Sequence, residues 1–391
     1  MLTSRPLEGI TVVEFGHSVA APYAGLILGE LGADVIKVEN ADGGDYARGW
    51  GPPFWEGTSV MYQVLNRSKS SVSLDLKDRI SGGKLHDYIV EKADVVIHNM
   101  KFGAMERLGF GSDTFVEKRP DLIYCNCGAF GNVGPLRDRP GYDPLLQAFS
   151  GLMSMMGEEG RPPVRVAVSI IDMGMGLWAA IGILAALNER NRTGNGGRVD
   201  TSLLETALGW LTVPFGNFLA SGELPRKEGS GAVQIVPYQA FIARDGEIMI
   251  LAGNDGLFRK LAQAIGRPDL TTDPRFMTNA GRVENRAVLL PILQKVLLDR
   301  DVAHWERLLL EAGVPHSPIQ TLDQVLAHPQ IEALSMLQES PDKKLRIMGL
   351  PLSFDGVRPE FTVRAPAQGQ HNELVDVRPL AAEKVDAAIG G

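Results

Sequence analysis

The sequence predicts an α/β protein in which a doubly wound parallel sheet is accompanied by a second compact unit. Short β-branched strands alternate with helical segments through the first half of the chain. A polar, glycine-bearing stretch at Pro225–Gly231 interrupts this pattern, and new strand and helix patterns follow to about Leu326. Such alternation builds parallel sheets that helices cover on both faces. We therefore expect a large α/β domain and a smaller α/β domain.

The individual elements are expected in the following order. The predicted strands are β-branched apolar runs at Ile10–Phe15, Asp34–Glu39, Ser71–Leu76, Asp94–Asn99 and Leu122–Cys127. Ala24–Leu31 has helical spacing, and Met173–Asn188 predicts a long apolar helix. In the second unit, Asp245-Gly246 lies between two strand-like runs and is typical of a hairpin turn.

Function is expected in the loops that follow the strands, because such folds bind ligands beyond the carboxyl ends of their strands. These loops are Gly16–Pro22, Asn40–Pro53, Asn99–Gly103 and Gly128–Asp143. The first loop has one glycine, whereas a dinucleotide site needs G-x-G-x-x-G there. The chain also lacks a P-loop, an H-x-x-H pair and a G-x-S-x-G motif. These absences disfavour a nicotinamide enzyme, a nucleoside triphosphatase and a serine hydrolase.

Length, charge and composition exclude further classes of protein. The 391 residues are enough for about two or three domain-sized units. A net charge of -8 argues against non-specific binding to nucleic acid or anionic membranes. We expect no metal site and no disulfide framework, because the only cysteines are Cys125 and Cys127 in one apolar run. No apolar run reaches membrane-spanning length, and Met1–Pro6 lacks the apolar stretch of a signal peptide, so we expect a cytoplasmic protein.

Asp172 is the first candidate for chemistry. It lies between the apolar run Val166–Ile171 and the long helix, so we expect it at the N-cap or just before it. One interpretation is a capping aspartate that accepts the first amide hydrogens of the helix. The other is a nucleophile, because the helix dipole keeps the carboxylate ionised and Gly174 and Gly176 let a ligand approach closely. Local sequence leaves both interpretations open.

Motifs along almost the whole chain favour the second interpretation. They are Pro6–Ile10, Leu31–Glu39, Gly44-Asp45 with Arg48, Asn66–Ser70 with Leu74 and Lys77, Asn99 with Gly103, Gly131–Asp143, Asp172, Arg192–Gly194, Pro237–Phe241, Asp273–Phe276, Ala312–Pro315 and Gly369–His371. In this order they resemble the family III CoA-transferases, typified by formyl-CoA transferase and carnitine CoA-transferase.

The resemblance implies a mechanism. Asp172 would attack a donor acyl-CoA and carry coenzyme A as an aspartyl thioester, which the acceptor carboxylate then takes over. The implied route needs neither ATP nor a metal, and coenzyme A and acyl-CoA act as substrates rather than as a permanently bound cofactor. Gly229 and Gly231 are implied to close over the tetrahedral oxyanion, although they also suit a plain flexible linker.

The resemblance also implies where coenzyme A binds. The implied contacts are His17, Ser18, Ala20, Leu74, Lys77, Asn99, Met100, Arg107 and Arg139. Lys77 and Arg107 can neutralise phosphate charge, although most such cations are solvated surface groups. Two positions depart from formyl-CoA transferase: Asn40 replaces an arginine that contacts coenzyme A, and Val19 replaces an active-site glutamine.

Two alternative functions remain. An α-methylacyl-CoA racemase of the same fold uses a His–Asp pair as acid and base. Here Tyr142 precedes Asp143, and a tyrosine with a pKa near 10 is a poor base at neutral pH. We expect Asp143 to orient the acceptor or Asp172, or to serve as a turn residue before Pro144. The second alternative is a non-catalytic acyl-CoA-binding protein, which the presence of Asp172 disfavours.

Architecture and partners follow from the resemblance. It implies a Rossmann-like large domain from residues 1–207 with a C-terminal return at 346–391, a small domain at 225–326, linkers at 208–224 and 327–345, and an interlocked homodimer. The expected small-molecule partners are an acyl-CoA and a carboxylate, with no nucleic acid and no membrane. Trp50–Phe54 is similar to a segment of succinyl-CoA-dependent members that activate dicarboxylates, so succinyl-CoA is a possible donor.

Overall fold

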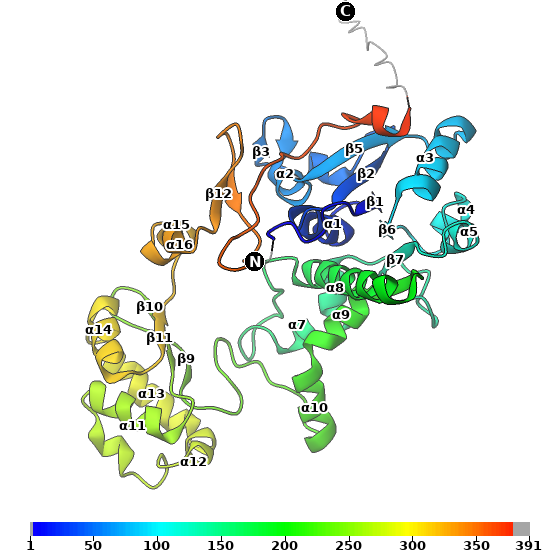
Figure 1. Cartoon of the computed structure of the whole chain (residues 1–391). Helices are drawn as coiled ribbons and strands as arrows, with labels where there is room; N and C mark the ends of the chain where they lie inside the picture. The colour runs from blue at the N-terminus through cyan, green and yellow to red at the C-terminus, as the bar shows by residue number, and fades with distance from the viewer. Residues whose placement is uncertain (1–2, 378–391) are drawn as a thin grey trace, which may run out of the picture. The chain divides into compact units, whose positions relative to one another are not determined.

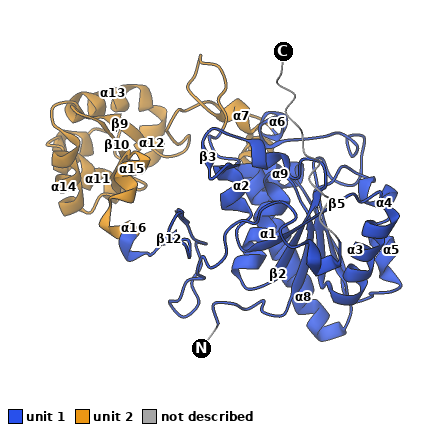
Figure 2. Cartoon of the chain, turned by 90° about the horizontal axis from the view of Figure 1, so that it is seen from above, with its two compact units in different colours: residues 1–150, 166–213, 332–391 blue, residues 151–165, 214–331 orange. Residues whose placement is uncertain are grey.

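The computed structural model describes residues 3–377, and the chain divides into two compact units (Figure 2). The first unit contains the described residues of Met1–Ser150, Val166–Val213 and the segment from Glu332 onward. The second contains Gly151–Arg165 and Pro214–Ile331. The sequence did not predict that Gly151–Arg165 groups with the second unit.

The core of the first unit is a six-stranded parallel sheet (Figure 1). In spatial order its strands are β5 (Lys69–Leu74), β2 (Asp34–Asn40), β1 (Thr11–Phe15), β6 (Val95–His98), β7 (Ile123–Gly128) and β8 (Gly197–Ser202). All neighbouring pairs are parallel. The chain builds outward from β1 to β5 and then restarts beside β1 with β6. The switch point of the sheet, where ligands bind in such folds, therefore lies between β1 and β6.

Helices cover both faces of this sheet. One face carries α1 (Ala20–Glu30), α8 (Ile170–Thr193) and α9 (Leu203–Trp210), and the other carries α3 (Arg79–Lys92), α4 (Ala104–Arg107) and α5 (Ser112–Val116). Neighbouring strand residues supply the two cores in turn, because side chains alternate along a strand. Val12 packs in the first core and Val13 in the second. The predicted mixed α/β architecture with a parallel sheet is confirmed.

The other elements of the first unit are short. They are η1 (Tyr46–Gly49), β3 (Phe54–Trp55), β4 (Thr58–Ser59), α2 (Val60–Leu65), α6 (Asp143–Phe149), β12 (Leu337–Glu339), β13 (Arg346–Met348) and η3 (Asn372–Val375), while α10 (Thr212–Ser221) and α16 (Pro329–Ala333) cross its boundaries. The segment before η3 covers the outer edge of β5. The backbone N–H of His371 donates to the carbonyl of Ser71 at 2.9 Å, and Asn372 accepts from the N–H of Ser73 at 2.7 Å. This pairing satisfies backbone groups that an edge strand would otherwise expose.

The second unit has its own core. Its sheet has the order β11 (His316–Pro318), β10 (Glu247–Leu251), β9 (Tyr238–Ile242), and its helices are α7 (Leu152–Met155), α11 (Asp255–Ala264), η2 (Pro268–Thr271), α12 (Asn279–Glu284), α13 (Arg286–Leu297), α14 (Val302–Ala312) and α15 (Leu322–Leu326). The predicted hairpin at Asp245-Gly246 joins β9 to β10, which pair antiparallel. Aromatic and aliphatic side chains of the sheet and helices, such as Phe241, Phe258 and Trp305, are buried together.

Two expectations about the elements are corrected. The sequence missed β8, because this edge strand exposes half of its residues, including Arg198 and Asp200, and lacks an apolar run. The run Val166–Ile171 forms no strand, and α8 begins at Ile170 and ends at Thr193. Among the described residues, α8 is the one helix whose length and apolar composition would allow it to cross a membrane, a property that core helices of soluble proteins share.

Gly174 and Gly176 serve helix packing, which corrects the expectation that they admit a ligand. A Cβ on Gly174 would lie 2.9 Å from the side chain of Thr206 on α9, and one on Gly176 would lie 2.7 Å from the carbonyl oxygen of Ala20 on α1. Both contacts are closer than real Cβ atoms allow. The two glycines therefore set how closely α8 approaches α1 and α9.

A Gly176→Ala substitution is expected to destabilise the protein by about 1–3 kcal/mol, because the backbone carbonyl of Ala20 has little room to move. The matched control is Gly209→Ala on α9, where a Cβ meets nothing within 4 Å. That change should be neutral or stabilising, since alanine is the better helix former. Urea unfolding of both variants measures the difference, and equal stabilities would contradict this packing.

Candidate active site

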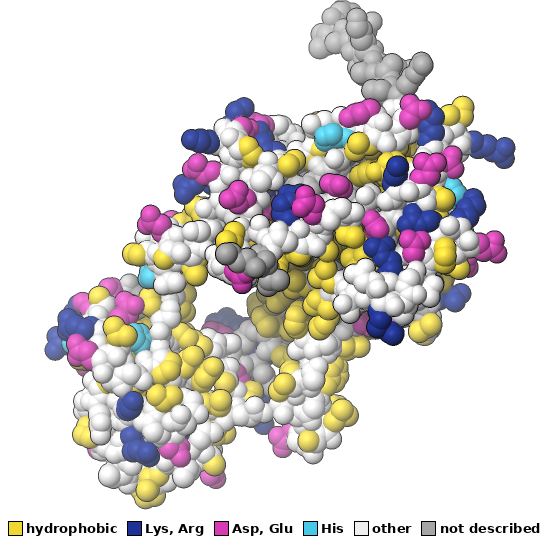
Figure 3. Space-filling view, viewed as in Figure 1, with side chains coloured by type: hydrophobic (Ala, Val, Ile, Leu, Met, Phe, Trp, Pro, Cys, Tyr) yellow, Lys and Arg dark blue, Asp and Glu magenta, His cyan; other side chains and the backbone are white. Residues whose placement is uncertain are grey.

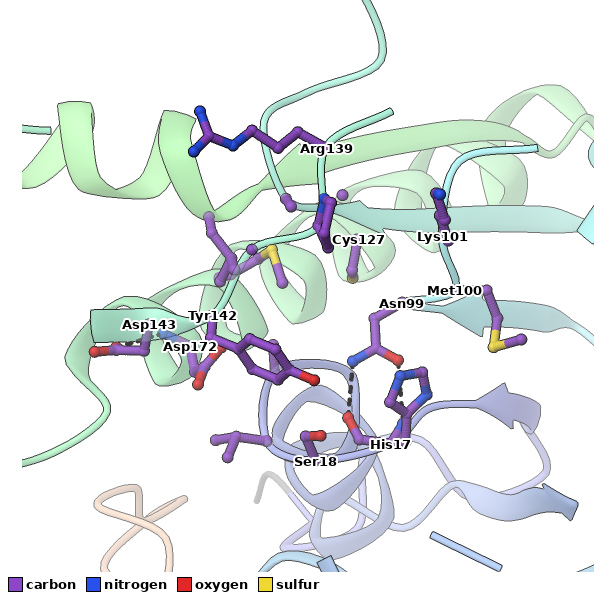
Figure 4. Close-up of a pocket in the computed structure, with 18 of the residues that line it drawn as sticks. His17, Ser18, Asn99, Met100, Lys101, Cys127, Arg139, Tyr142, Asp143 and Asp172 are labelled. Carbon is purple, nitrogen blue, oxygen red and sulfur yellow. Dashed lines mark hydrogen bonds between the residues drawn. The ribbon is translucent and has the colours of Figure 1, made fainter. Parts of the chain in front are cut away.

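A cavity of about 470 Å³ opens at the carboxyl ends of β1, β6 and β7, within the first unit (Figure 4). Most of its lining residues come from the loops after these strands, from the segment before α6 and from the first turns of α1 and α8. This is the edge of the sheet at which the sequence predicted function. The predicted residues that line it are His17, Ser18, Ala20, Asn99, Met100, Arg139, Asp143 and Asp172.

Loops from both sides of the switch point meet in this cavity. The backbone N–H of His17, after β1, donates to Asn99 Oδ1 at 3.1 Å, and Asn99 Nδ2, after β6, donates back to the carbonyl of His17 at 2.8 Å (Figure 4). Burial lowers the pKa of His17, which favours a neutral imidazole at pH 7. The reciprocal pair makes the two loops a single wall of the cavity.

Asp172 lies in the first turn of α8 and lines the cavity. It is the third residue of the helix, and Ser169 occupies the N-cap without a side-chain hydrogen bond to the helix. The expected N-cap position of Asp172 is therefore wrong. Because its carboxylate is not needed to cap α8, the side chain can face the cavity instead.

Asp143 caps α8 in its place. Its carboxylate accepts from the backbone N–H of Ile171 at 2.7 Å and of Asp172 at 3.2 Å, and Gln147 Nε2 donates to its second oxygen at 2.5 Å. The side chain of Asp143 is 1% exposed, so these bonds are well shielded from water. Of the roles weighed for Asp143, this geometry matches orientation of Asp172: one carboxylate holds the backbone that carries the other.

The carboxyl group of Asp172 is a weaker acid than that of an ordinary aspartate. Burial, with the nearby negative charge of Asp143, raises the pKa of Asp172 from 3.8 to about 7. The sequence predicts that the helix dipole keeps this carboxylate ionised, but burial and the charge of Asp143 oppose the dipole and raise the pKa. A carboxylate of higher basicity is a better nucleophile, and near pH 7 a large fraction is still ionised.

A second cavity of about 420 Å³ adjoins the first. It contains the predicted Leu74 and Lys77, and the residues common to both cavities are His17, Met100 and Lys101. The departure Asn40 lines this second cavity, and the other departure, Val19, lines the first. Together they form an extended groove that contains Asp172 in the first cavity and Lys77 in the second. An elongated ligand fits such a groove.

Two groups of predicted residues lie outside the two cavities. Arg107 is exposed at the end of α4 and lines neither cavity, although its guanidinium lies over Gly103 in the loop after β6. Gly229 and Gly231 belong to the second unit. Their N–H groups donate to the carbonyls of Gly157 and Glu228, so an oxyanion would require this loop to rearrange.

The sequence did not single out several lining residues. Lys101 and Arg137 add positive charge to the first cavity, and Met61 adds an apolar side chain. Trp50, which the sequence named only as part of the segment Trp50–Phe54, also lines this cavity. Lys101 could have been found, because it directly follows the predicted Asn99 and Met100 in a loop at the switch point. Met61 offers no such signal, since it lies on α2, away from the predicted loops.

Comparison with known proteins matches residues 7–372 to the CoA-transferase family III model. Human succinyl-CoA:glutarate CoA-transferase is 34% identical over 389 residues, which cover 99% of this chain and 88% of that protein. The succinate–glutarate CoA-transferase of Agrobacterium fabrum is 36% identical over 384 residues, covering 95% of this chain and 94% of that protein. A CAIB/BAIF family protein from Brucella suis has a solved structure that superposes with a TM-score of 0.85 at 36% identity, covering 95% of this chain and 99% of that one. The chain therefore belongs to CoA-transferase family III.

Proposed function

We propose that this CoA-transferase moves coenzyme A from succinyl-CoA to a dicarboxylic acid through an aspartyl-CoA thioester on Asp172. The observation that carries the proposal is the position of Asp172: a carboxyl group with a pKa of about 7, in a groove that extends to Lys77. Dicarboxylates are proposed as acceptors because relatives with this extent of similarity are named for succinate and glutarate.

The first half of the proposed reaction forms the thioester. An ionised oxygen of Asp172 attacks the thioester carbonyl carbon of the donor, the carbon–sulfur bond breaks, and the coenzyme A thiolate departs. A mixed anhydride between Asp172 and the donor acid remains. The thiolate then attacks the carbonyl carbon of Asp172 and forms a new carbon–sulfur bond. The donor acid leaves with the bridging oxygen, so no water, metal or nucleotide enters the balance.

The second half reverses these bonds with the acceptor. A carboxylate oxygen of the acceptor attacks the aspartyl thioester, the thiolate leaves, and a new mixed anhydride forms. The thiolate attacks the acceptor's acyl carbon, and Asp172 departs as a carboxylate. The bridging oxygen, which came from the acceptor, remains on Asp172. Burial of Asp172 and the capping bonds of Asp143 support this route, because they fix the nucleophile in a partly dry site.

Coenzyme A is proposed to occupy the extended groove. Its pantetheine arm would pass the His17–Asn99 pair, where the two cavities meet, and its nucleotide would reach Leu74 and Lys77. Lys101 lines both cavities and is an additional cation for the phosphates. Arg107 is retained as a proposed phosphate contact at the rim, since it is exposed beside the groove.

The interlocked homodimer and the cytoplasmic location stay predictions. An exposed apolar face on α8 and α9 supports a second copy as partner. On these helices Trp178 is 46% exposed, Ile181 52% and Trp210 46%. Figure 3 shows apolar side chains that gather on the surface in this part of the first unit. Exposed apolar side chains that gather in one place are typical of association surfaces. Size measurement in solution, at several protein concentrations, tests the dimer.

An acceptor panel tests the proposed substrate class. With succinyl-CoA as donor, glutarate should form a new thioester at least about tenfold faster than valerate, which replaces the distal carboxylate by a methyl group. The physical reason is the positive charge of Lys101, Arg137 and Arg139 around the first cavity. Mass spectrometry of the thioesters measures both rates. Equal rates would refute the dicarboxylate preference, and absence of transfer to every acid would refute the proposed donor.

A further inference from the structure

The loop between β1 and α1 has no regular secondary structure, yet its backbone is firmly held. Ser18 has a φ of 68°, in the left-handed region that residues with a side chain rarely adopt. Asn99 bonds the N–H and the carbonyl of His17, as described above. The loop also depends on two charged residues for which neither the sequence nor the proposed reaction gives a role: Lys37 and Asp45.

Lys37 reaches the loop from beneath. Its Nζ donates to the carbonyl oxygen of Gly16 at 2.6 Å, and it also contacts Asp45 Oδ2 at 2.9 Å and Glu14 Oε1 at 3.2 Å. The side chain is completely buried. Burial alone would lower its pKa, but Glu14 and Asp45 outweigh burial and raise it, so Lys37 stays charged.

Asp45 holds the next peptide of the loop. Its Oδ1 accepts from the backbone N–H of Ser18 at 3.0 Å and from that of Ala47 at 2.9 Å, where it caps η1. One oxygen of Asp45 therefore fixes Ser18, while the other is held by Lys37. Four consecutive polar groups of the loop, from the Gly16 carbonyl to the Ser18 N–H, are thus bonded by side chains from other elements.

The residues around Lys37 leave the loop Gly16–Ser18 little room to move. Glu14 also pairs with a second buried lysine, Lys69, at 2.8 Å, so the cluster with Lys37 and Asp45 contains equal numbers of positive and negative charges. A Cβ on Gly16 would lie 2.9 Å from Glu14 Oε1. The cluster therefore fills the space under the loop, and the loop has no room to relax toward it.

We propose that Lys37 and Asp45 are positioning residues that hold the loop Gly16–Ser18 in the shape that binds the coenzyme A thioester. This inference depends on the proposed function, in which that loop contacts coenzyme A. His17 lines both cavities, so the loop lies where they meet. A displaced loop would change the shape of the groove without touching Asp172.

A buried ion pair is weak evidence for stability, because the cost of removing charges from water can exceed their attraction. The contacts of Lys37 and Asp45 instead fix one particular backbone path, which includes the strained residue Ser18. The positioning role therefore predicts that loss of these contacts weakens coenzyme A binding by more than a loss of stability alone would. Binding and unfolding can be measured separately.

The test compares Asp45→Ser with Asp45→Asn. Serine is a favourable N-cap and can still bond Ala47, but it is too short to reach the N–H of Ser18, whereas asparagine keeps an acceptor oxygen for both. For Asp45→Ser we expect the dissociation constant for coenzyme A, measured by calorimetry, and the KM for succinyl-CoA to rise about tenfold. The kcat should change less than about threefold, and Asp45→Asn should bind within about threefold of the wild type.

The matched control is Glu30→Gln. Glu30 is 4% exposed and pairs with buried Arg67 at 3.0 Å, and it makes no contact with the loop. It should lower the unfolding temperature and leave the dissociation constant and the KM unchanged. An Asp45→Ser variant that behaves like this control would overturn the proposal, as would an Asp45→Asn variant that binds as weakly as the serine variant.

A second variant decides the question if Asp45→Ser does not fold. Lys37→Met combined with Glu14→Gln keeps the cluster neutral but removes the bond to Gly16. It should also weaken coenzyme A binding about tenfold, and unchanged binding would overturn the proposal. Failure of the proposed function is distinguishable, because the wild-type protein itself would then not bind coenzyme A.

Discussion

Replacing Asp172 with alanine is expected to lower CoA transfer from succinyl-CoA to glutarate by at least about a thousandfold. The variant retains the groove and its cations, so binding of coenzyme A should change little. It lacks the oxygen that attacks the donor. The carboxylate of Asp143, which is bonded to the first turn of α8, is occupied by capping. Initial rates at saturating substrate measure the effect.

Two companion variants make this result specific. Asp172→Asn keeps the shape of the side chain and should be equally inactive, because an amide is a poor nucleophile. Asp113→Ala removes an exposed carboxylate on α5 and should retain full activity. If Asp172→Ala kept more than a few per cent of the wild-type rate, the proposed covalent route would be wrong.

Changes at Asp143 should have the second largest effect, because this residue controls both the position and the acidity of Asp172. Asp143→Ala removes the acceptor for two N–H groups of α8 and is expected to lower kcat about ten- to a hundredfold. Asp143→Asn keeps an acceptor oxygen but removes the negative charge. The two variants therefore separate the capping bond from the charge.

The dependence of activity on pH measures the effect that the charge of Asp143 has on Asp172. Because the ionised carboxylate is the nucleophile, activity should fall as the pH is lowered through the pKa of Asp172, about 7 in the wild type. Without the charge of Asp143, that pKa is lower, and the midpoint of the profile moves to lower pH. The Asp143→Asn variant should then retain a larger share of its activity at pH 6. A midpoint that stays in place would show that Asp143 does not act through this charge.

The parts of the fold that could be predicted are those with local signals. β-branched runs gave the strands around the switch point to within a few residues, and Asp245-Gly246 gave its hairpin. β8 could not be predicted from an apolar run, because it is a polar edge strand. The first turn of α8 was also missed, because its apolar start at Ile170 is equally typical of a strand. Its N-cap Ser169 lies inside the apolar run and makes no side-chain hydrogen bond to the helix.

The candidate site also has parts that could be predicted from local sequence and parts that could not. Loops after strands were identifiable, and they contain His17, Asn99 and Asp143. The capping of α8 was not, because Asp143 lies 28 residues before Ile171 and the bond exists only once α6 packs beside α8. The roles of Gly174 and of Gly176 depend on neighbouring helices in the same way. The contacts of Asp143, Gly174 and Gly176 thus depend on packing between distant parts of the chain, which local sequence does not indicate.

Oxygen labelling of Asp172 tests the central claim most directly. The wild-type protein would turn over succinyl-CoA and glutarate whose carboxylate oxygens are ¹⁸O, and the peptide containing Asp172 would then be analysed by mass spectrometry. The proposed route predicts that labelled oxygen enters the Asp172 carboxyl group during turnover and does not enter it when coenzyme A thioester is left out. Transfer of coenzyme A to glutarate with no label in Asp172 would contradict a covalent role for this residue.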